Sequence, residues 1–162
     1  MIMLWTLTVL MILVIYYDAR YYIIPNWLNL SVIALYVAFF LMHMPNPWWG
    51  GFAAMGIMFA LGMGMFALGI MGGGDVKLLT ALMLWMGWSK VSLAFILYFS
   101  LAGGVLAIFI IMLRRLICPL IFRGKMTAEL PRIFIRNQPI PYGIAIAGAF
   151  LLLLHTGQVS EF

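Results

Sequence analysis

Charged residues are scarce in this sequence, and their scarcity excludes most soluble folds. Of 162 residues, 8% are charged and 67% are hydrophobic, whereas a soluble domain carries about a quarter charged residues. So few charges cannot cover a water-exposed surface, so the bilayer must solvate most of the chain. The length predicts a single domain over residues 1–162. The net charge of +5 indicates membrane topology signals and no nucleic-acid partner.

Cysteine and histidine are also few, and each shortage removes a class of chemistry. The single cysteine, Cys118, rules out an internal disulfide and a multi-cysteine zinc site. The two histidines, His43 and His155, are expected on the side of the membrane opposite the aspartates, which argues against a catalytic triad or a metal site. We therefore expect no metal and no cofactor. Residues 1–17 carry no charge, so they are interpreted as a retained span and not as a cleaved signal peptide.

Long apolar runs make up most of the chain, and they predict an all-α membrane bundle of six transmembrane helices. A helix needs about 20 apolar residues to cross the hydrocarbon core. Prolines, glycines and charges divide the chain into spans at 1–18, 26–43, 50–71, 75–88, 91–113 and 140–156. Glycines in the third and sixth spans are expected to allow close helix contact, and Gly69 and Gly73 have the spacing of a small-residue packing face.

The distribution of Lys and Arg sets the predicted topology. With six spans, all nine of these residues except Lys90 fall on one side of the membrane. Because basic residues are retained on the cytoplasmic side, the segments 18–25, 72–77 and 114–138 are expected in the cytoplasm and both termini outside. Five spans would violate this rule. The basic loop 114–138 is expected to lie on anionic membrane lipid.

Only four residues are acidic, and two of them, Asp18 and Asp75, lie at the ends of apolar spans on the same predicted side. Glu129 and Glu161 are interpreted as solvated charges. An ionisable side chain at membrane depth is costly, which makes it a functional candidate. Two carboxylates close together cannot both ionise easily, so they share a proton and can hold a water between them. One carboxylate then deprotonates the water while the other protonates a scissile carbonyl oxygen, which is aspartic-protease chemistry.

The residues flanking the two aspartates extend the candidate site. A run of three glycines precedes Asp75 and lets the backbone come close to an extended peptide. Proline-containing turns open the second and sixth spans. A lysine after Asp75 is either a membrane anchor or a group that acts on Asp75 or on the substrate. The flanking candidates are Gly72, Gly73, Gly74, Lys77, Pro25, Asn26, Pro141, Tyr142 and Gly143.

These motifs, in this order, resemble those of type IV prepilin peptidases. Asp18 followed by Ile24-Pro25-Asn26 resembles their first active-site motif, and Gly72-x-Gly74-Asp75-x-Lys77 resembles their GxGD motif. Pro141-Tyr142-Gly143-x-Ala145 is similar to the segment that opens their last helix. The resemblance implies an inner-membrane aspartyl protease that cuts the short basic leader from prepilins, pseudopilins or preflagellins. It also implies that Asp18 and Asp75 are the catalytic pair.

The chain differs from many members of that family in being short. Longer, bifunctional members also methylate the new N-terminus and carry paired cysteines in an N-terminal region, whereas this chain has one cysteine. It resembles the short form found with Tad-type (Flp) pilus systems, which implies a peptidase without methyltransferase activity. Archaeal preflagellin peptidases are a close second. Presenilin-type proteases share the GxGD logic, but their Pro-Ala-Leu motif is absent here.

Two other function classes compete with the protease. A small proton-coupled transporter would use the aspartates as a proton relay, but carriers place such sites near the midplane and are often built from repeats. This sequence has no internal repeat, and its aspartates are expected at one face. A structural scaffold gives no reason for two aspartates at that face. The sequence therefore predicts the protease, with the transporter as the alternative.

Overall fold

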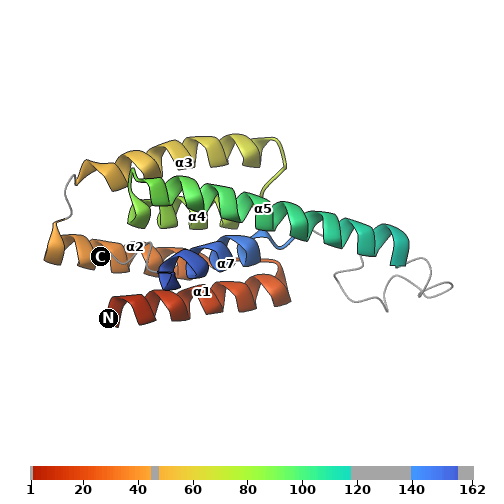
Figure 1. Cartoon of the computed structure of the whole chain (residues 1–162), viewed down its shortest axis with the longest axis horizontal. Coiled ribbons are helices and arrows are strands. Elements are labelled where there is room, and N and C mark those ends of the chain that lie inside the picture. Colours follow the sequence, from red (N-terminus) through yellow and green to blue (C-terminus); the bar gives the residue numbers. More distant parts are fainter. Residues whose placement is uncertain (1, 45–47, 118–139, 157–162) are drawn as a thin grey trace.

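The fold is a bundle of long helices that lie side by side (Figure 1). The structure, a computed structural model, describes residues 2–44, 48–117 and 140–156. Within these ranges it contains helices and no strand, as the sequence predicted. The helices are α1 (Ile2–Tyr21), α2 (Asn26–His43), α3 (Trp49–Ala67), α4 (Gly73–Met86), α5 (Lys90–Met112) and α7 (Tyr142–His155), and a π-helical segment, η1 (Leu113–Ile117), continues α5.

Each of the six predicted spans corresponds to one α-helix, but the helices differ in length. Among the described residues, α1, α2, α3 and the continuous helix Lys90–Leu116 are long and apolar enough to cross a membrane. The helices α4 and α7 have 14 residues each. Both are largely buried, and α4 packs against α3, α2 and α7. Because other helices surround α4, it occupies the centre of the bundle.

The third predicted span is too long, because α3 ends at Ala67 and not near residue 71. Gly69 adopts a φ of +71°, a left-handed conformation that suits glycine. The N–H groups of Gly69 and Ile70 donate to the carbonyls of Phe66 and Met65 at 2.9 and 3.0 Å, which is the Schellman arrangement that terminates helices. The predicted packing face of Gly69 and Gly73 is therefore wrong, since the two residues do not share a helix.

The predicted role of glycine in helix packing is right at some positions and wrong at others. A Cβ placed on Gly51 would lie 2.6 Å from the Leu84 carbonyl oxygen, and one on Gly62 would lie 2.7 Å from Val76. Those two glycines therefore let α3 approach α4 closely. A Cβ on Gly56, Gly64 or Gly148 would meet nothing within 4 Å, so close packing does not require them.

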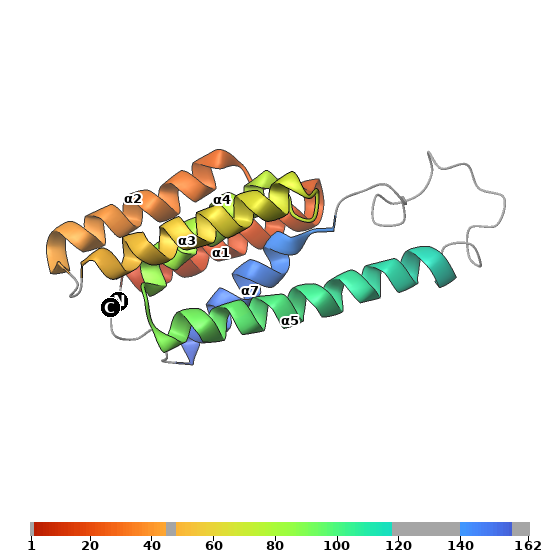
Figure 2. The ribbon, with the colours of Figure 1, turned by 90° about the horizontal axis from the view of Figure 1, so that it is seen from above.

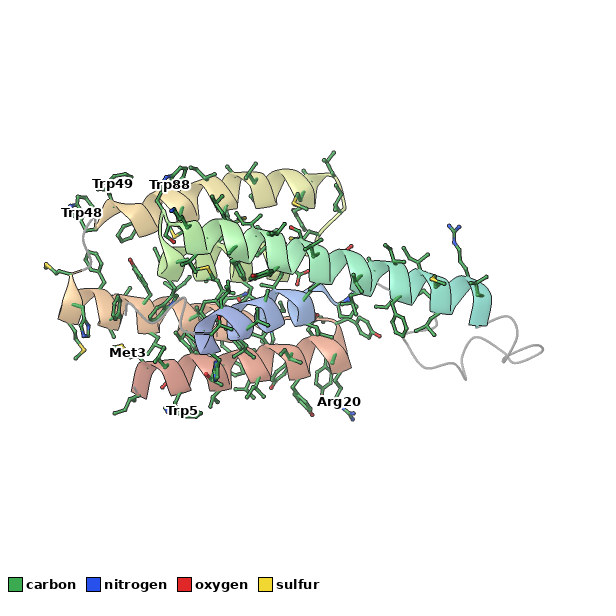
Figure 3. The ribbon with its side chains drawn as sticks, viewed as in Figure 1. Met3, Trp5, Arg20, Trp48, Trp49 and Trp88 are labelled. Atoms are coloured by element: carbon green, nitrogen blue, oxygen red, sulfur yellow. The ribbon has the colours of Figure 1, made fainter. Side chains whose placement is uncertain are left out.

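The two ends of the bundle differ in composition, as Figure 3 shows. Trp48, Trp49 and Trp88 lie at one end, which we call the tryptophan end, and Arg20 lies at the other, the arginine end. The helix α1 begins, and α7 ends, at the tryptophan end (Figure 1). The segments that connect α1 to α2 and α3 to α4 lie at the arginine end, so both aspartates lie there. The histidines that end α2 and α7 lie away from them.

Part of the predicted basic loop 114–138 is helical. Arg114 and Arg115 belong to η1, so the prediction that a loop begins at residue 114 is wrong. The remainder of that stretch from residue 118 on lies outside the described residues, as do the predicted turn at 45–47, Cys118, Glu129 and Glu161.

Candidate active site

A cavity of about 790 Å³ contains both aspartates at the arginine end. Its walls come from the connection between α1 and α2, the connection between α3 and α4, and the segments on either side of residues 118–139. Asp18 lies close enough to Asp75 for their charges to interact. The site candidates that line this cavity are Asp18, Pro25, Asn26, Gly72, Gly73, Gly74, Asp75 and Tyr142.

The carboxylate of Asp18, at the end of α1, contacts the first turn of α7. It lies in the last turn of α1, which extends three residues beyond the predicted end of the first span, and it is buried. Its Oδ2 accepts a hydrogen bond of 3.1 Å from the backbone N–H of Ile144, and the amide of Gly143 also faces it. These amides belong to the first turn of α7, where unpaired N–H groups attract an anion. The contact therefore joins α1 to α7 through the carboxylate.

Gly143 makes that contact possible because it has no side chain. A Cβ at this position would lie 2.8 Å from Asp18 Oδ2 and 2.8 Å from Ile24 Cδ1, closer than atoms pack without shifting. Gly143 and the buried Pro141 before it do not line the cavity themselves. Their contribution is to bring the α7 N-terminus against Asp18.

Asp75 is held by its own helix. Gly72 is the N-cap of α4, so Asp75 is the third residue of the helix. The backbone N–H of Gly72 faces the Asp75 carboxylate, which is the reach-back contact of a capping box. A Cβ on Gly72 would lie 3.1 Å from Asp75 Oδ2. The first turn of α4 therefore fixes this buried carboxylate at the cavity wall.

Polar contacts between α2 and α4 hold the two aspartate-bearing segments together. Lys77 Nζ donates to Asn26 Oδ1 at 2.9 Å, and the buried Asn29 donates from Nδ2 to the Gly74 carbonyl at 3.5 Å. Lys77 is exposed and lies outside the cavity lining. The structure thus gives Lys77 a partner that the sequence did not predict, the side chain of Asn26.

The chain turns sharply after Asp18, at a residue that the sequence did not single out. Tyr22 has a φ of +58°, which is uncommon for an aromatic residue. Its N–H donates to the Asp18 carbonyl at 3.0 Å and closes the end of α1. Tyr22 and the two residues after it, Ile23 and Ile24, then line the cavity.

Sequence reasoning also missed Arg114, which lines the same cavity as the aspartates. It was interpreted only as one of many topology signals, because no short motif links it to either aspartate. Arg114 belongs to the π-helical segment η1, and π-helical turns are frequent at functional sites. The end of α5 is thus part of the cavity wall.

The sequence matches a known protein family. A sequence profile of the type IV leader peptidase family matches residues 5–108, well over half of the 162 residues. The match includes Asp18 and Asp75 and ends before Arg114 and the 141–143 segment. No curated protein and no solved structure matches the chain. The protein belongs to the type IV leader peptidase family.

Proposed function

We propose that this protein is an intramembrane aspartyl endopeptidase in which Asp18 and Asp75 are the catalytic pair. The observation that carries the proposal is that the two carboxylates, on different helices, line one cavity. Both are buried. Burying a carboxylate costs free energy unless it is paired or hydrogen-bonded, so two such groups in one cavity indicate a functional site. Membership of a leader peptidase family supports the same reaction.

The reaction needs only the two carboxyl groups and a water. One carboxylate takes a proton from the water, whose oxygen attacks the scissile carbonyl carbon while the other carboxyl group protonates the carbonyl oxygen. The tetrahedral intermediate then breaks at its C–N bond, and the amine leaves with a proton from a carboxyl group. Each aspartate is held by backbone N–H groups at the start of a helix, which keeps the pair oriented throughout.

The substrate we propose is the short basic leader of a prepilin-like, pseudopilin-like or preflagellin-like protein. The cavity is lined on one side by residues 22–26 and on the other by residues 69–74. The second wall has four glycines among its six residues, so few side chains keep an extended peptide away from the backbone there. Two carboxylates also favour a basic peptide by charge.

We further propose a multi-pass inner-membrane protein whose active site faces the cytoplasm. Arg20, Lys77, Arg114 and Arg115 belong to the same end of the bundle as the aspartates, and basic residues mark the cytoplasmic side. Six spans would then place both termini outside. The absence of methyltransferase activity and the link to a Tad-type system belong to this proposal.

Replacing either aspartate tests the function. Asp18→Asn and Asp75→Asn should each abolish leader removal from a co-expressed prepilin, seen as the loss of a gel shift, because neither amide can exchange the proton. Thr6→Val is the control, because Thr6 is an exposed residue near the start of α1 that does not line the aspartate cavity, and this variant should cleave normally. Cleavage should also persist after metal chelation. Full cleavage by both aspartate variants would refute the aspartyl mechanism, and proton flux without cleavage in liposomes would favour the transporter.

A further inference from the structure

A second cavity, of about 460 Å³, lies at the tryptophan end between α3, α4 and α5. Its lining is largely apolar and includes Leu61 of α3, Met83 of α4 and Ile96 of α5. Trp88 and Lys90 stand at its outer edge, and both are exposed. The aspartate cavity lies at the opposite ends of α4 and of the continuous helix Lys90–Leu116, so this long helix runs from one cavity to the other.

The same face of α5 lines both cavities. Ile96 lines the second cavity and Arg114 lines the aspartate cavity, 18 residues further on. At about 100° per residue, 18 residues make five full turns, and the two π-helical steps at Arg114 reduce this rotation only slightly, so the two side chains project in nearly the same direction. At a rise of about 1.5 Å per residue they are about 27 Å apart, close to the roughly 30 Å thickness of the hydrocarbon core.

Between the two cavities, this face of α5 has little to pack against. The helix packs mainly on α7 and only lightly on α4. Figure 2 shows α7 between α5 and α1, and Figure 1 shows α5 diverging from α3 toward its C-terminal end. Between Ile96 and Ile111, the residues on this face are small: Ser100, Gly104 and Ala107. A Cβ on Gly104, or on Gly64 of α3, would meet nothing within 4 Å. We call this opening the α3–α5 gap.

We propose that the α3–α5 gap binds the hydrophobic helix of the substrate, with the leader that precedes the helix lying in the aspartate cavity. This inference rests on the proposed function, because a peptidase for a membrane-anchored substrate must bring one end of a helix to Asp18 and Asp75. The gap has the length of one span, and small residues along it allow a second helix backbone to come close.

The charges at the two ends of the gap fix the direction of the bound helix. The N-terminus of a helix carries a partial positive charge and its C-terminus a partial negative charge. Asp18, Asp75 and Arg114 line the cavity at one end of the gap, and Lys90 lies at the other end. A substrate helix that begins at the aspartate cavity therefore ends beside Lys90, whose charge is opposite to that of the helix C-terminus.

Cysteine cross-linking locates the substrate helix directly. The enzyme background carries Cys118→Ser, which removes the native cysteine, and Asp75→Asn, which prevents cleavage of the substrate. Leu61→Cys or Ser100→Cys is added to this background. Each variant is then oxidised together with a prepilin that carries one cysteine in its hydrophobic helix. Disulfides form only between Cα atoms within about 7 Å. We expect cross-linked product at both gap positions and none at Leu30→Cys, an exposed residue of α2. Equal cross-linking at Leu30→Cys, or enzyme dimers alone, would overturn the inference.

A steric variant gives an independent readout. Gly104→Phe should raise KM for the full prepilin about tenfold or more, because an excluded group is discriminated on that scale. The control is Gly56→Phe, which lines neither cavity and also has open space around it. Unchanged KM for Gly104→Phe would contradict the inference. Failure of the unsubstituted enzyme to cleave any prepilin would instead refute the proposed function.

Discussion

Replacing Gly143 with alanine tests whether Asp18 depends on the start of α7. The added Cβ would lie 2.8 Å from Asp18 Oδ2 and 2.8 Å from Ile24 Cδ1, whereas ordinary contacts begin at 3.4 Å. Either these atoms or the helix must therefore move by about 0.6 Å, the difference between those distances. The helix α7 packs against both α1 and α5, so it is not free to retreat, and overpacking of this kind costs about 1–3 kcal/mol.

The displacement should also reduce catalysis. A misplacement of about 1 Å can cost 100-fold in rate, so a shift of about 0.6 Å should lower kcat for leader cleavage by about tenfold or more. The matched control is Gly148→Ala in the same helix, where the added Cβ meets nothing within 4 Å. That variant should gain about 0.5–1 kcal/mol from the helix preference of alanine and keep its activity.

The assay combines thermal unfolding in detergent with leader-cleavage kinetics for both variants. Asp18→Ala removes one of the two clashing groups, so it should reduce the loss of stability that Gly143→Ala causes, which a double-mutant cycle measures. If Gly143→Ala unfolds and cleaves like Gly148→Ala, the close contact between Asp18 and α7 is wrong. If the cycle shows no coupling, the stability loss does not come from the carboxylate.

Two further predictions concern the segments around the cavity. Gly69→Ala should lower the free energy of unfolding by about 1 kcal/mol, because alanine tolerates the left-handed conformation poorly. The control, Gly64→Ala, should not lower it, because Gly64 has a helical backbone and open space around it. Equal melting temperatures for the two variants would contradict the Schellman turn. Lys77→Met and Asn26→Ala should each lower the rate of cleavage severalfold. The two losses should not add in the double variant, since each substitution removes the same hydrogen bond. Additive losses would show that the two side chains act separately.

The helices were predictable because the apolar runs are long and their interruptions are local. The predicted second span, 26–43, matches α2 at both ends, and Pro25, the N-cap residue, marks its start in the sequence. The end of α3 was not predictable from hydropathy, since Ile70 and Met71 are as apolar as the helix before them. Only the left-handed Gly69 and its hydrogen bonds show that the chain has turned there.

The candidate site also contains residues that the sequence could identify and residues that it could not. Asp18 and Asp75 were found because acidic residues are rare in an apolar chain, and rarity can be counted without a structure. The hydrogen-bond partner of Asn29 was not predictable, because its bond to Gly74 spans 45 positions. Arg114 was missed because it reaches the cavity from the far end of a separate helix.

By itself, then, the sequence determined that the chain belongs in a bilayer, which segments are helical and which two carboxylates can do chemistry. These depend on residue type and local spacing. Only the tertiary structure decided that Asp18 contacts the start of α7, that Lys77 meets Asn26, and that α5 leaves a gap beside α3. Such features depend on how helices pack, and packing joins residues whose separation along the chain carries no local signal.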